Sequence, residues 1–599
     1  MNSLELLRRH EPVIRYTEGE MFFPTDVEGY VRRSELWRRE DRDWERLRYA
    51  GEVDLETLAA EQHRENGRPL FLRLVDRPLS ATEYGRWRTT RPPFRRQGRL
   101  ARVGLVPRFL DAFFTFSLLL RGRVPGGTAA AASVKYNDML RARPGYCYYG
   151  RLSLQGDYTV LQYFFFYAMN DWRSSFFGVN DHEADWEQVL VYLGSDRNGD
   201  LQPLWLALAA HDYSGDDLRR RWDDPRLELL DGTHPVIYAG AGSHAAYLEP
   251  GDYLLSFQAK PLKPLEEAFQ LLHRFWRDVL KQGEARGLAE EVHGLVTVPF
   301  VDYARGDGLA IGPGQTAGWS PVLIDESVSW VSGYRGLWGL DTEDIFEGER
   351  APAGPMYTRW GTERRSWYDP VGWVGLDKVA TPARADEYLR SRMDELERQA
   401  EDAASQASAL EGELPRLGLE VDALRKSEGL QEMYEVRADE LRRGEAELAT
   451  LRARQEQLTD ALAACRRHLQ VLESGYTGDP EAHLQQRPRP APPEEGRRGR
   501  LAEFWAAIST GALLLGAVAL LVIGDRVITG LVMLVITAVL VDSILRGTIA
   551  RLLLNVTIGA AVIALGILIF EFFWHLTLAA IAIIGVLILL DNVRELHGR

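Results

Sequence analysis

The chain has 599 residues, a formal net charge of −15 at pH 7 and only two cysteines, Cys147 and Cys465. This length allows about three or four domains. The negative charge, without a basic patch interleaved with aromatic residues, excludes a general nucleic-acid-binding protein. Two cysteines in segments of very different character exclude a disulfide framework as the source of stability.

Residues 1–380 are predicted to form a mainly-β sandwich domain with helical insertions. All of the 16 tryptophans except Trp505 and Trp574 fall here, and this density of large aromatics predicts a substantial packed core. Short alternating or aromatic runs between Gly, Pro and Asp residues are typical of many short strands joined by long loops. The N-terminus lacks the apolar core of a secretory signal, so we expect this domain to stay in the cytoplasm.

Two apolar stretches in this region predict helices. Residues 108–120 are apolar but too short to cross a bilayer, so we expect a buried or interfacial helix there. Residues 262–280 carry apolar side chains at helical spacing, which predicts an amphipathic helix packed on its own domain.

A dense group of metal-ligand side chains lies at the start of a predicted strand. Residues 180–193 read N-D-H-E-A-D-W-E-Q-V-L-V-Y-L. The alternation that begins at Trp186 places Asp185 and Glu187 on one face of the strand, with His182 on the loop before it. Imidazole and carboxylate ligands together favour a divalent cation over a thiolate-seeking metal. The alternative is that these are ordinary polar residues at the mouth of a strand.

The surroundings favour a site over that alternative. An aromatic run at 163–167 ends just before Asp171, so this carboxylate can reach the same sheet end. Four of the 12 histidines lie within 63 residues: His182, His211, His234 and His244. The sequence therefore predicts a divalent cation, Ca²⁺ or Mg²⁺ before others, with the ligands Asp171, His182, Asp185 and Glu187 and the secondary candidates His211 and His244.

Residues 383–474 are predicted to form a coiled coil. Apolar residues recur at alternating spacings of four and three over residues 389–424, and a second phase covers 451–472. Three residues interrupt the middle of the segment: Pro415, Gly418 and Gly429. Either one kinked helix or a folded-back hairpin satisfies this pattern. A kinked helix would favour a homo-oligomer, whereas a hairpin could bury its seam within one chain.

The last part of the chain is predicted to be a membrane anchor. Residues 475–500 form a Pro-rich, charged linker with no capacity for a core. Beyond it, region 501–593 contains four apolar runs that each approach the ~20 residues needed to cross a bilayer: 503–523, 527–545, 552–571 and 573–590. We therefore expect four transmembrane helices.

The arginines predict the orientation of this anchor. They lie before the first span, between the second and third, and after the fourth, whereas the other two loops hold only Arg526. By the positive-inside rule, both termini and the large soluble domain are cytoplasmic. The polar residues in or near the spans are Asp542, Asn555, Glu571 and His575. All but Asn555 lie near a span end, so we favour interfacial anchoring over an ion path.

Two resemblances extend this interpretation. His182, Asp185, Trp186 and Glu187 match the H-x-x-D-W-E core of necrosis- and ethylene-inducing peptide-like proteins. That resemblance implies a cation bound by the His, Asp and Glu together with an aspartate of the preceding strand end, for which Asp171 is the matching position. More of the chain resembles the vacuolar protein sorting-associated protein 62-like family, through four segments that span roughly residues 10 to 380: 10–30, 161–193, 239–247 and 337–378. This second resemblance implies a β-sandwich and a cation site, but no particular reaction.

Three functions are compatible with these features. The first is a membrane-anchored, cation-dependent recognition module whose ligand is a phosphate, an anionic lipid headgroup or a glycan. The second is a metal-dependent hydrolase in which His211 or His244 acts as general acid or base. The third is an oligomeric channel or envelope-remodelling protein with a cytosolic sensor domain. The sequence has no nucleophile elbow, phosphate loop or H-E-x-x-H motif, so we favour binding over catalysis.

Overall fold

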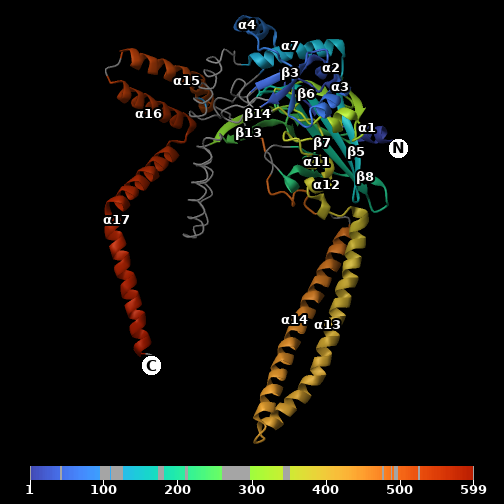
Figure 1. The fold of residues 1–599 in the computed structure, drawn as a ribbon, viewed down its shortest axis with the longest axis vertical. Helices are drawn as coiled ribbons and strands as arrows, with labels where there is room; N and C mark the ends of the chain where they lie inside the picture. Colours follow the sequence, from blue (N-terminus) through green and yellow to red (C-terminus); the bar gives the residue numbers. More distant parts are fainter. Residues whose placement is uncertain are drawn as a thin grey trace.

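A computed structural model describes most of the chain, with short gaps. The described residues are 2–40, 43–94, 108, 126–172, 181–209, 214–258, 297–340, 351–474, 478–486, 489–490, 497–523 and 526–597. A sheet-rich N-terminal region is followed by two long helices and then by three helices near the C-terminus (Figure 1). The helix predicted at 262–280, residues 109–120 of the other predicted helix, and His211 lie outside the described residues.

The main sheet has six strands in the spatial order β16, β5, β6, β7, β8 and β9. The strands are β5 (Tyr146–Gln155), β6 (Tyr158–Asn170), β7 (His182–Ser195), β8 (Leu201–Leu208), β9 (Arg219–Arg221) and β16 (Trp319–Leu323). All neighbours are antiparallel except β16 and β5. In the long β6–β7 pair, Tyr167 lies opposite Asp185 and Phe165 lies opposite Glu187. The aromatic run and the ligand-rich run of the sequence are therefore direct neighbours.

A second sheet packs on one face of the main sheet. It consists of β1 (Val13–Arg15), β10 (Leu229–Leu230), β11 (His234–Ala239), β12 (Ala246–Tyr247) and β15 (Ala310–Ile311). Alternate side chains of β6 and β7, such as Phe165 and Val191, are buried against Ile14, Ile237 and Ile311 of this sheet. Period-two alternation buries one face of each strand in the layer between the sheets. The predicted β-sandwich is confirmed.

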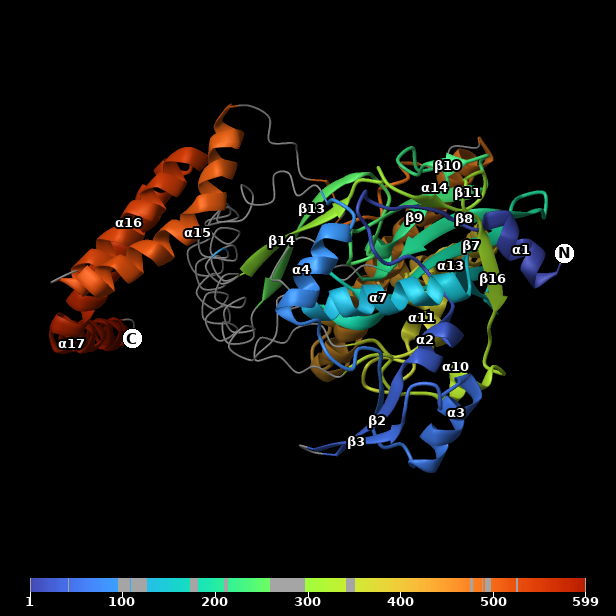
Figure 2. The ribbon, with the colours of Figure 1, turned by 90° about the horizontal axis from the view of Figure 1, so that it is seen from above.

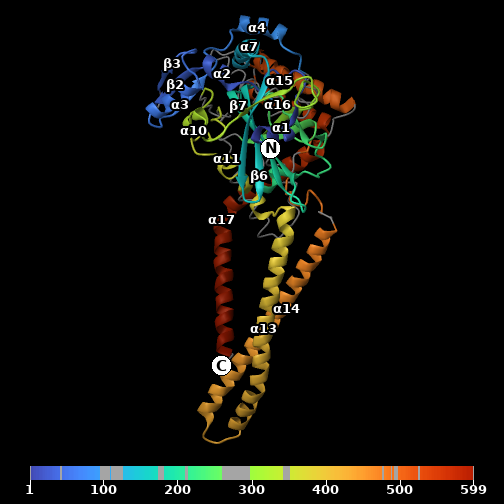
Figure 3. The ribbon, with the colours of Figure 1, turned by 90° about the vertical axis from the view of Figure 1, so that its right-hand side faces the viewer.

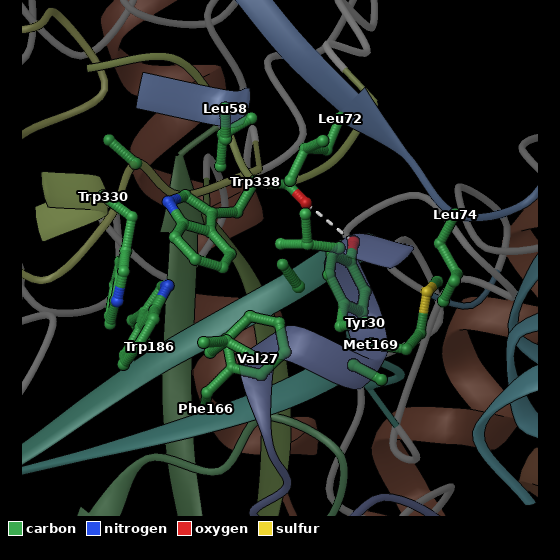
Figure 4. Close-up of a cluster of buried hydrophobic side chains, with 14 of the residues drawn as sticks. Val27, Tyr30, Leu58, Leu72, Leu74, Phe166, Met169, Trp186, Trp330 and Trp338 are labelled. Carbon is green, nitrogen blue, oxygen red and sulfur yellow. Dashed lines mark hydrogen bonds between the residues drawn. The ribbon is translucent and has the colours of Figure 1, made fainter. Parts of the chain in front are cut away.

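Helices and a small sheet cover part of the other face of the main sheet (Figure 2). The elements here are α2 (Val27–Arg33), α3 (Leu55–Arg64), α7 (Gly127–Ala142), α10 (Ser329–Gly333), β2 (Glu35–Glu40), β3 (Asp43–Arg48) and β4 (Leu70–Arg73). Their core is aromatic: Trp186 of β7 meets Trp338 edge to face, with ring centroids 5.4 Å apart. The Tyr30 hydroxyl donates a 2.7 Å hydrogen bond to the Trp338 carbonyl oxygen (Figure 4). Trp186 thus packs on one face of β7 while its neighbours Asp185 and Glu187 belong to the other.

Smaller elements complete the domain. They are α1 (Ser3–His10), α4 (Ala81–Thr90), the hairpin of β13 (Gly251–Gln258) and β14 (Thr297–Ala304), α11 (Arg365–Tyr368), α12 (Pro370–Trp373) and two 3₁₀ turns at Gly215–Leu218 and Leu376–Lys378. Tyr192 and Leu190 of β7 pack against Val371 and Val374, so the segment after α11 covers the other end of the main sheet.

The two long helices form an antiparallel hairpin (Figure 3). They are α13 (Pro382–Arg425) and α14 (Gln431–Glu473), and α13 continues through Pro415. Ion pairs join the two helices along their length: Arg390–Glu473 at 2.8 Å, Arg466–Glu397 at 2.8 Å, Arg452–Glu411 at 2.7 Å and Arg437–Glu420 at 3.1 Å. The hairpin alternative is therefore the observed one. The coiled coil and a homo-oligomer formed through this segment stay predictions.

The predicted linker is partly docked on the N-terminal domain. The backbone N–H of Gln485 donates a 2.7 Å hydrogen bond to the Asp217 carboxylate, and the Arg221 guanidinium donates to the Gly478 carbonyl oxygen at 3.2 Å. The His483 ring meets Trp205 of β8 edge to face. The segment was expected to be a linker without a core of its own, and its described residues contact the N-terminal domain beside the edge strand β9.

Within the described part of the chain, three C-terminal helices are long and apolar enough to cross a membrane: α15 (Arg497–Ile523), α16 (Val527–Arg546) and α17 (Ile549–His597). Their apolar spans are Phe504–Val522, Val527–Arg546 and Phe570–Arg594. The third and fourth predicted spans both fall in α17, which stays helical through 572–575, where a turn was expected. At 1.5 Å per residue, α17 would be about 74 Å long, more than twice the thickness of a bilayer core. The four-span arrangement stays a prediction.

Candidate functional site

The predicted cation ligands lie at one end of the main sheet. His182, Asp185 and Glu187 are all on β7 and are buried, and β6 ends at Asn170. Asp171 follows directly, and its backbone N–H donates a 3.0 Å hydrogen bond to the Gly242 carbonyl oxygen. The strand pairing explains this placement, because the end of β6 lies beside the start of β7 in an antiparallel pair.

The arrangement of these four side chains as one ligand set stays a prediction. Among the described residues, no group of three or more His, Cys, Asp or Glu side chains that could hold a metal ion is found. His182 Nδ1 lies 2.8 Å from the Ala184 carbonyl oxygen. Ala184 has a φ of 60°, a left-handed conformation that interrupts the regular alternation of β7 between His182 and Asp185. Sequence alternation alone could not anticipate this irregularity.

Asp185 pairs with His244 instead. The Asp185 Oδ2 lies 3.0 Å from His244 Nδ1, and the imidazole stacks flat on the Tyr167 ring with centroids 3.7 Å apart. His244 Nε2 lies 3.9 Å from Glu20 Oε1. The His244 side chain is fully buried. One secondary candidate from the sequence thus contacts one of the primary candidates.

The electrostatics of this cluster favour the imidazolium form of His244. Burial opposes the charge, but the interactions with Asp185 and Glu20 outweigh it and raise the pKa of His244 to about 9. Arg364 lies nearby: burial and the neighbouring Arg359 lower its pKa to about 10, while the Glu187 and Asp185 carboxylates act in the opposite direction. The cluster therefore contains both acidic and basic groups in a largely dehydrated setting.

Glu20 is the residue that the sequence interpretation missed. Its Oε1 accepts hydrogen bonds from the backbone N–H groups of Met21 and Phe22, at 2.7 and 2.9 Å. Its Oε2 accepts from the Gly242 N–H at 2.7 Å. The N-terminal segment, β7 and the Gly242–His244 turn therefore meet at one point. Glu20 lies within residues 10–30, one of the segments that carry the family resemblance, and that was the available signal.

Two buried polar atoms flank Asp185 without a hydrogen-bond partner among the described residues: Asn170 Oδ1 and His244 Nε2. Both belong to side chains that contact Asp185, since Asn170 Nδ2 also donates to Asp185 Oδ2 at 3.3 Å. Buried polar atoms without protein partners are usually satisfied by a water or an ion. The backbone adds a second indication, because His244, like Ala184, has a left-handed φ, here 57°. Strained backbone of this kind concentrates at functional sites.

Ser243 belongs to a separate hydrogen-bond network. Its Oγ donates to Asp302 Oδ2 at 2.7 Å, and the Tyr247 hydroxyl donates to the same oxygen at 2.8 Å. A Cβ on Gly240 would lie 2.3 Å from Ser243 Oγ, so the turn requires glycine there. Ser243 is thus oriented by Asp302 and not by His244, and it is not arranged as a nucleophile with an adjacent imidazole base.

His234, another of the clustered histidines, lies on β11 with its Nδ1 2.9 Å from the Glu11 carbonyl oxygen, and His211 is outside the described residues. Of the described histidines in this cluster, His182 and His244 lie at this sheet end.

Comparison with known proteins identifies no relative. No protein-family model matches the chain, and neither a curated protein nor a solved structure is significantly similar to it. The resemblance to the vacuolar protein sorting-associated protein 62-like family and the motif shared with necrosis- and ethylene-inducing peptide-like proteins stay predictions.

Proposed function

We propose that this chain is a membrane-anchored recognition module whose N-terminal domain binds a divalent cation beside Asp185. The cation, Ca²⁺ or Mg²⁺, would present an open coordination position to an anionic ligand, for which a phosphate-bearing lipid headgroup is our first choice and a glycan the second. Asp185 would be the central ligand. Asp171, His182 and Glu187 are the further ligands from the same sheet end.

The observation that carries this proposal is the buried Asn170 Oδ1 beside Asp185, which has no hydrogen-bond partner among the described residues. Asn170 Oδ1 is a hard oxygen donor of the kind that Ca²⁺ and Mg²⁺ prefer. The hydrogen bond from His182 Nδ1 to a backbone carbonyl also supports it, because it leaves Nε2 as the electron-donating nitrogen, which is the usual arrangement of a metal-binding histidine. To bind the cation, the Asp185 carboxylate would have to bridge the cation and His244 or give up its contact with His244 Nδ1.

Asp185→Asn is expected to weaken cation binding at least ~10-fold, because it removes the central negative charge while preserving shape. Titration calorimetry of the full-length protein in detergent with Ca²⁺ and with Mg²⁺ measures this, supported by elemental analysis of the purified protein. Asp224→Asn is the matched control, since Asp224 is an equally buried aspartate in the turn after β9. Binding of no cation by the native protein, or equal binding by both variants, would contradict the proposal.

A metal-dependent hydrolase is the second candidate, and the Asp185–His244 pair favours it. A carboxylate that holds Nδ1 of an imidazole orients Nε2 as a general acid or base. We rank it second because His244 is fully buried and stacked on Tyr167, so a substrate could reach Nε2 only after movement of the domain. A screen of the full-length protein with phosphoester and glycoside substrates decides between the two. Turnover that Asp185→Asn abolishes and Asp224→Asn preserves would establish the hydrolase.

The anchor is proposed to cross the membrane four times, with both termini and the N-terminal domain in the cytoplasm. The distribution of arginines supports this, and it requires α17 to break near 572–575. Single cysteines test it in a Cys465→Ser background, where Cys147 stays unreactive because burial raises the pKa of its thiol to about 12. In intact cells, we expect an impermeant maleimide to label Trp574→Cys but not His597→Cys. The reverse pattern would indicate three crossings.

A further inference from the structure

The two helices α15 and α16 pack antiparallel in a definite register. Gly516 of α15 faces the Leu534 side chain of α16, and Gly530 of α16 faces the Leu520 side chain of α15. Glycine at these two positions leaves room for the leucines, since a Cβ on either glycine would lie 3.1 Å or less from the facing leucine side chain. Figure 2 shows the two helices side by side. In this register, Ser509 near the start of the α15 span lies at the level of Asp542 near the end of α16.

A residue from the N-terminal region lies between these two helices. Arg108 Nη1 donates a 2.9 Å hydrogen bond to Ser509 Oγ, and Arg108 Nη2 donates to Asp542 Oδ1. Arg546 completes the cluster, with its Nε 2.9 Å from Asp542 Oδ2. The Arg108 side chain is 4 % exposed, and Ser509 is fully buried. Asp542 was expected to anchor a span end at the interface, and here it also pairs with a residue 434 positions away.

The positions of Ser509 and Asp542 within their spans place this cluster just inside the membrane, on the arginine-rich side. Ser509 is five residues after Phe504, the first residue of the α15 span, which corresponds to about 7 Å along a helix. Asp542 is one turn before Arg546, the last residue of the α16 span. Residues 104–120, which flank Arg108, contain only one further charged residue, Asp111. A guanidinium can lie at this depth because it is paired with the Asp542 carboxylate.

The connection between the domain and the anchor is also short. A Cβ on Gly251 would lie 2.3 Å from the Pro490 Cβ, so Pro490 packs closely on the start of β13. Helix α15 begins at Arg497, and seven extended residues reach at most about 25 Å. The N-terminal domain is thus held near the membrane surface by its own chain, independently of Arg108.

We propose that Arg108 gives the N-terminal domain a second attachment point to the membrane anchor. The Arg108 side chain docks between the cytoplasmic ends of α15 and α16. The partner is this chain's own anchor, and the recognition element is the Asp542 carboxylate with the Ser509 hydroxyl beside it. Docking there orients the sandwich domain on the membrane, whereas a tether alone would leave it free to rotate.

Crosslinking in native membranes tests this docking. The full-length chain carries Cys465→Ser, Phe109→Cys and Thr510→Cys, with a protease site inserted in the exposed turn at 426–430 of the helical hairpin. After treatment with a short bismaleimide and cleavage, crosslinked halves stay together on a denaturing gel. The control pair, Phe109→Cys with Val522→Cys, places the second thiol at the other end of α15. We expect efficient crosslinking of the first pair only.

The ion pair itself is tested in the same background. Arg108→Ala or Asp542→Ala is expected to lower the crosslinking yield roughly 10-fold, because a charge-assisted hydrogen bond is lost. Arg108→Lys should retain much of the yield, and exchange of the two charges, Arg108→Asp with Asp542→Arg, should restore it in a protein that inserts normally. Equal crosslinking of the test and control pairs, or a yield that Arg108→Ala leaves unchanged, would overturn the proposal.

Discussion

Replacement of Glu183 by alanine is expected to destabilise the N-terminal domain by about 3–5 kcal/mol. The Glu183 carboxylate is buried on β7 and accepts three backbone hydrogen bonds, from Val75 at 2.6 Å, Leu74 at 3.0 Å and Leu340 at 3.1 Å. It joins β7 to the segment after β4 and to the stretch that follows Trp338. Alanine would leave three buried N–H donors without an acceptor, and each such loss is costly because water cannot replace it.

Denaturant unfolding of the full-length protein, followed by tryptophan fluorescence, measures this effect. Glu56→Ala is a suitable control, because Glu56 is exposed in the first turn of α3, and a change within about 1 kcal/mol is expected there. Glu183→Gln should lower the free energy of unfolding by an intermediate amount. Its amide retains one acceptor oxygen but also presents an N–H₂ group to the backbone donors. The account of Glu183 would be wrong if its alanine variant were no less stable than Glu56→Ala.

Acidification is expected to destabilise the domain through His10, by up to about 3 kcal/mol below pH 4. His10 ends α1 and is 2 % exposed, with its Nδ1 3.3 Å from the Thr233 carbonyl oxygen. Burial lowers the pKa of His10 from 6.5 to about 4, although the Thr233 hydrogen bond partly opposes this. Between these two pH values the unfolded chain binds a proton that the folded chain does not. The contribution of His10 to stability is therefore fully present above pH 6.5 and is lost as the pH falls towards 4.

The measurement is the free energy of unfolding from pH 7.5 to 4 for the native protein and for His10→Gln. The variant cannot bind this proton. Between pH 7.5 and 4, its free energy of unfolding should therefore fall by about 3 kcal/mol less than that of the native protein. His63→Gln is the control, because His63 is exposed on α3 and should leave the pH dependence unchanged. Parallel curves for native protein and His10→Gln would show that His10 is not the origin of the acid sensitivity.

Some features of the site were accessible from the sequence because they depend on local periodicity. The alternation after Trp186 correctly separates Trp186, in the aromatic core, from Asp185 and Glu187 on the opposite face of β7. The expectation that Asp171 lies at the same sheet end follows from the pairing of two consecutive strands. The left-handed Ala184, which interrupts the strand alternation between His182 and Asp185, could not be predicted in this way.

The sandwich, the two long helical segments and the apolar C-terminal helices could be predicted because strand alternation, heptad spacing and long apolar runs are properties of neighbouring residues. Contacts between distant segments appear only in the folded structure. Glu20 meets His244, Asp217 binds Gln485, and Arg108 reaches Asp542, each across more than 200 positions. The folded structure also decided between the kinked helix and the folded-back hairpin, since the sequence allowed both, and the break between α13 and α14 with the ion pairs that join them shows the hairpin. A buried charged side chain can pair with a residue from any part of the chain, so no local sequence pattern predicts its partner.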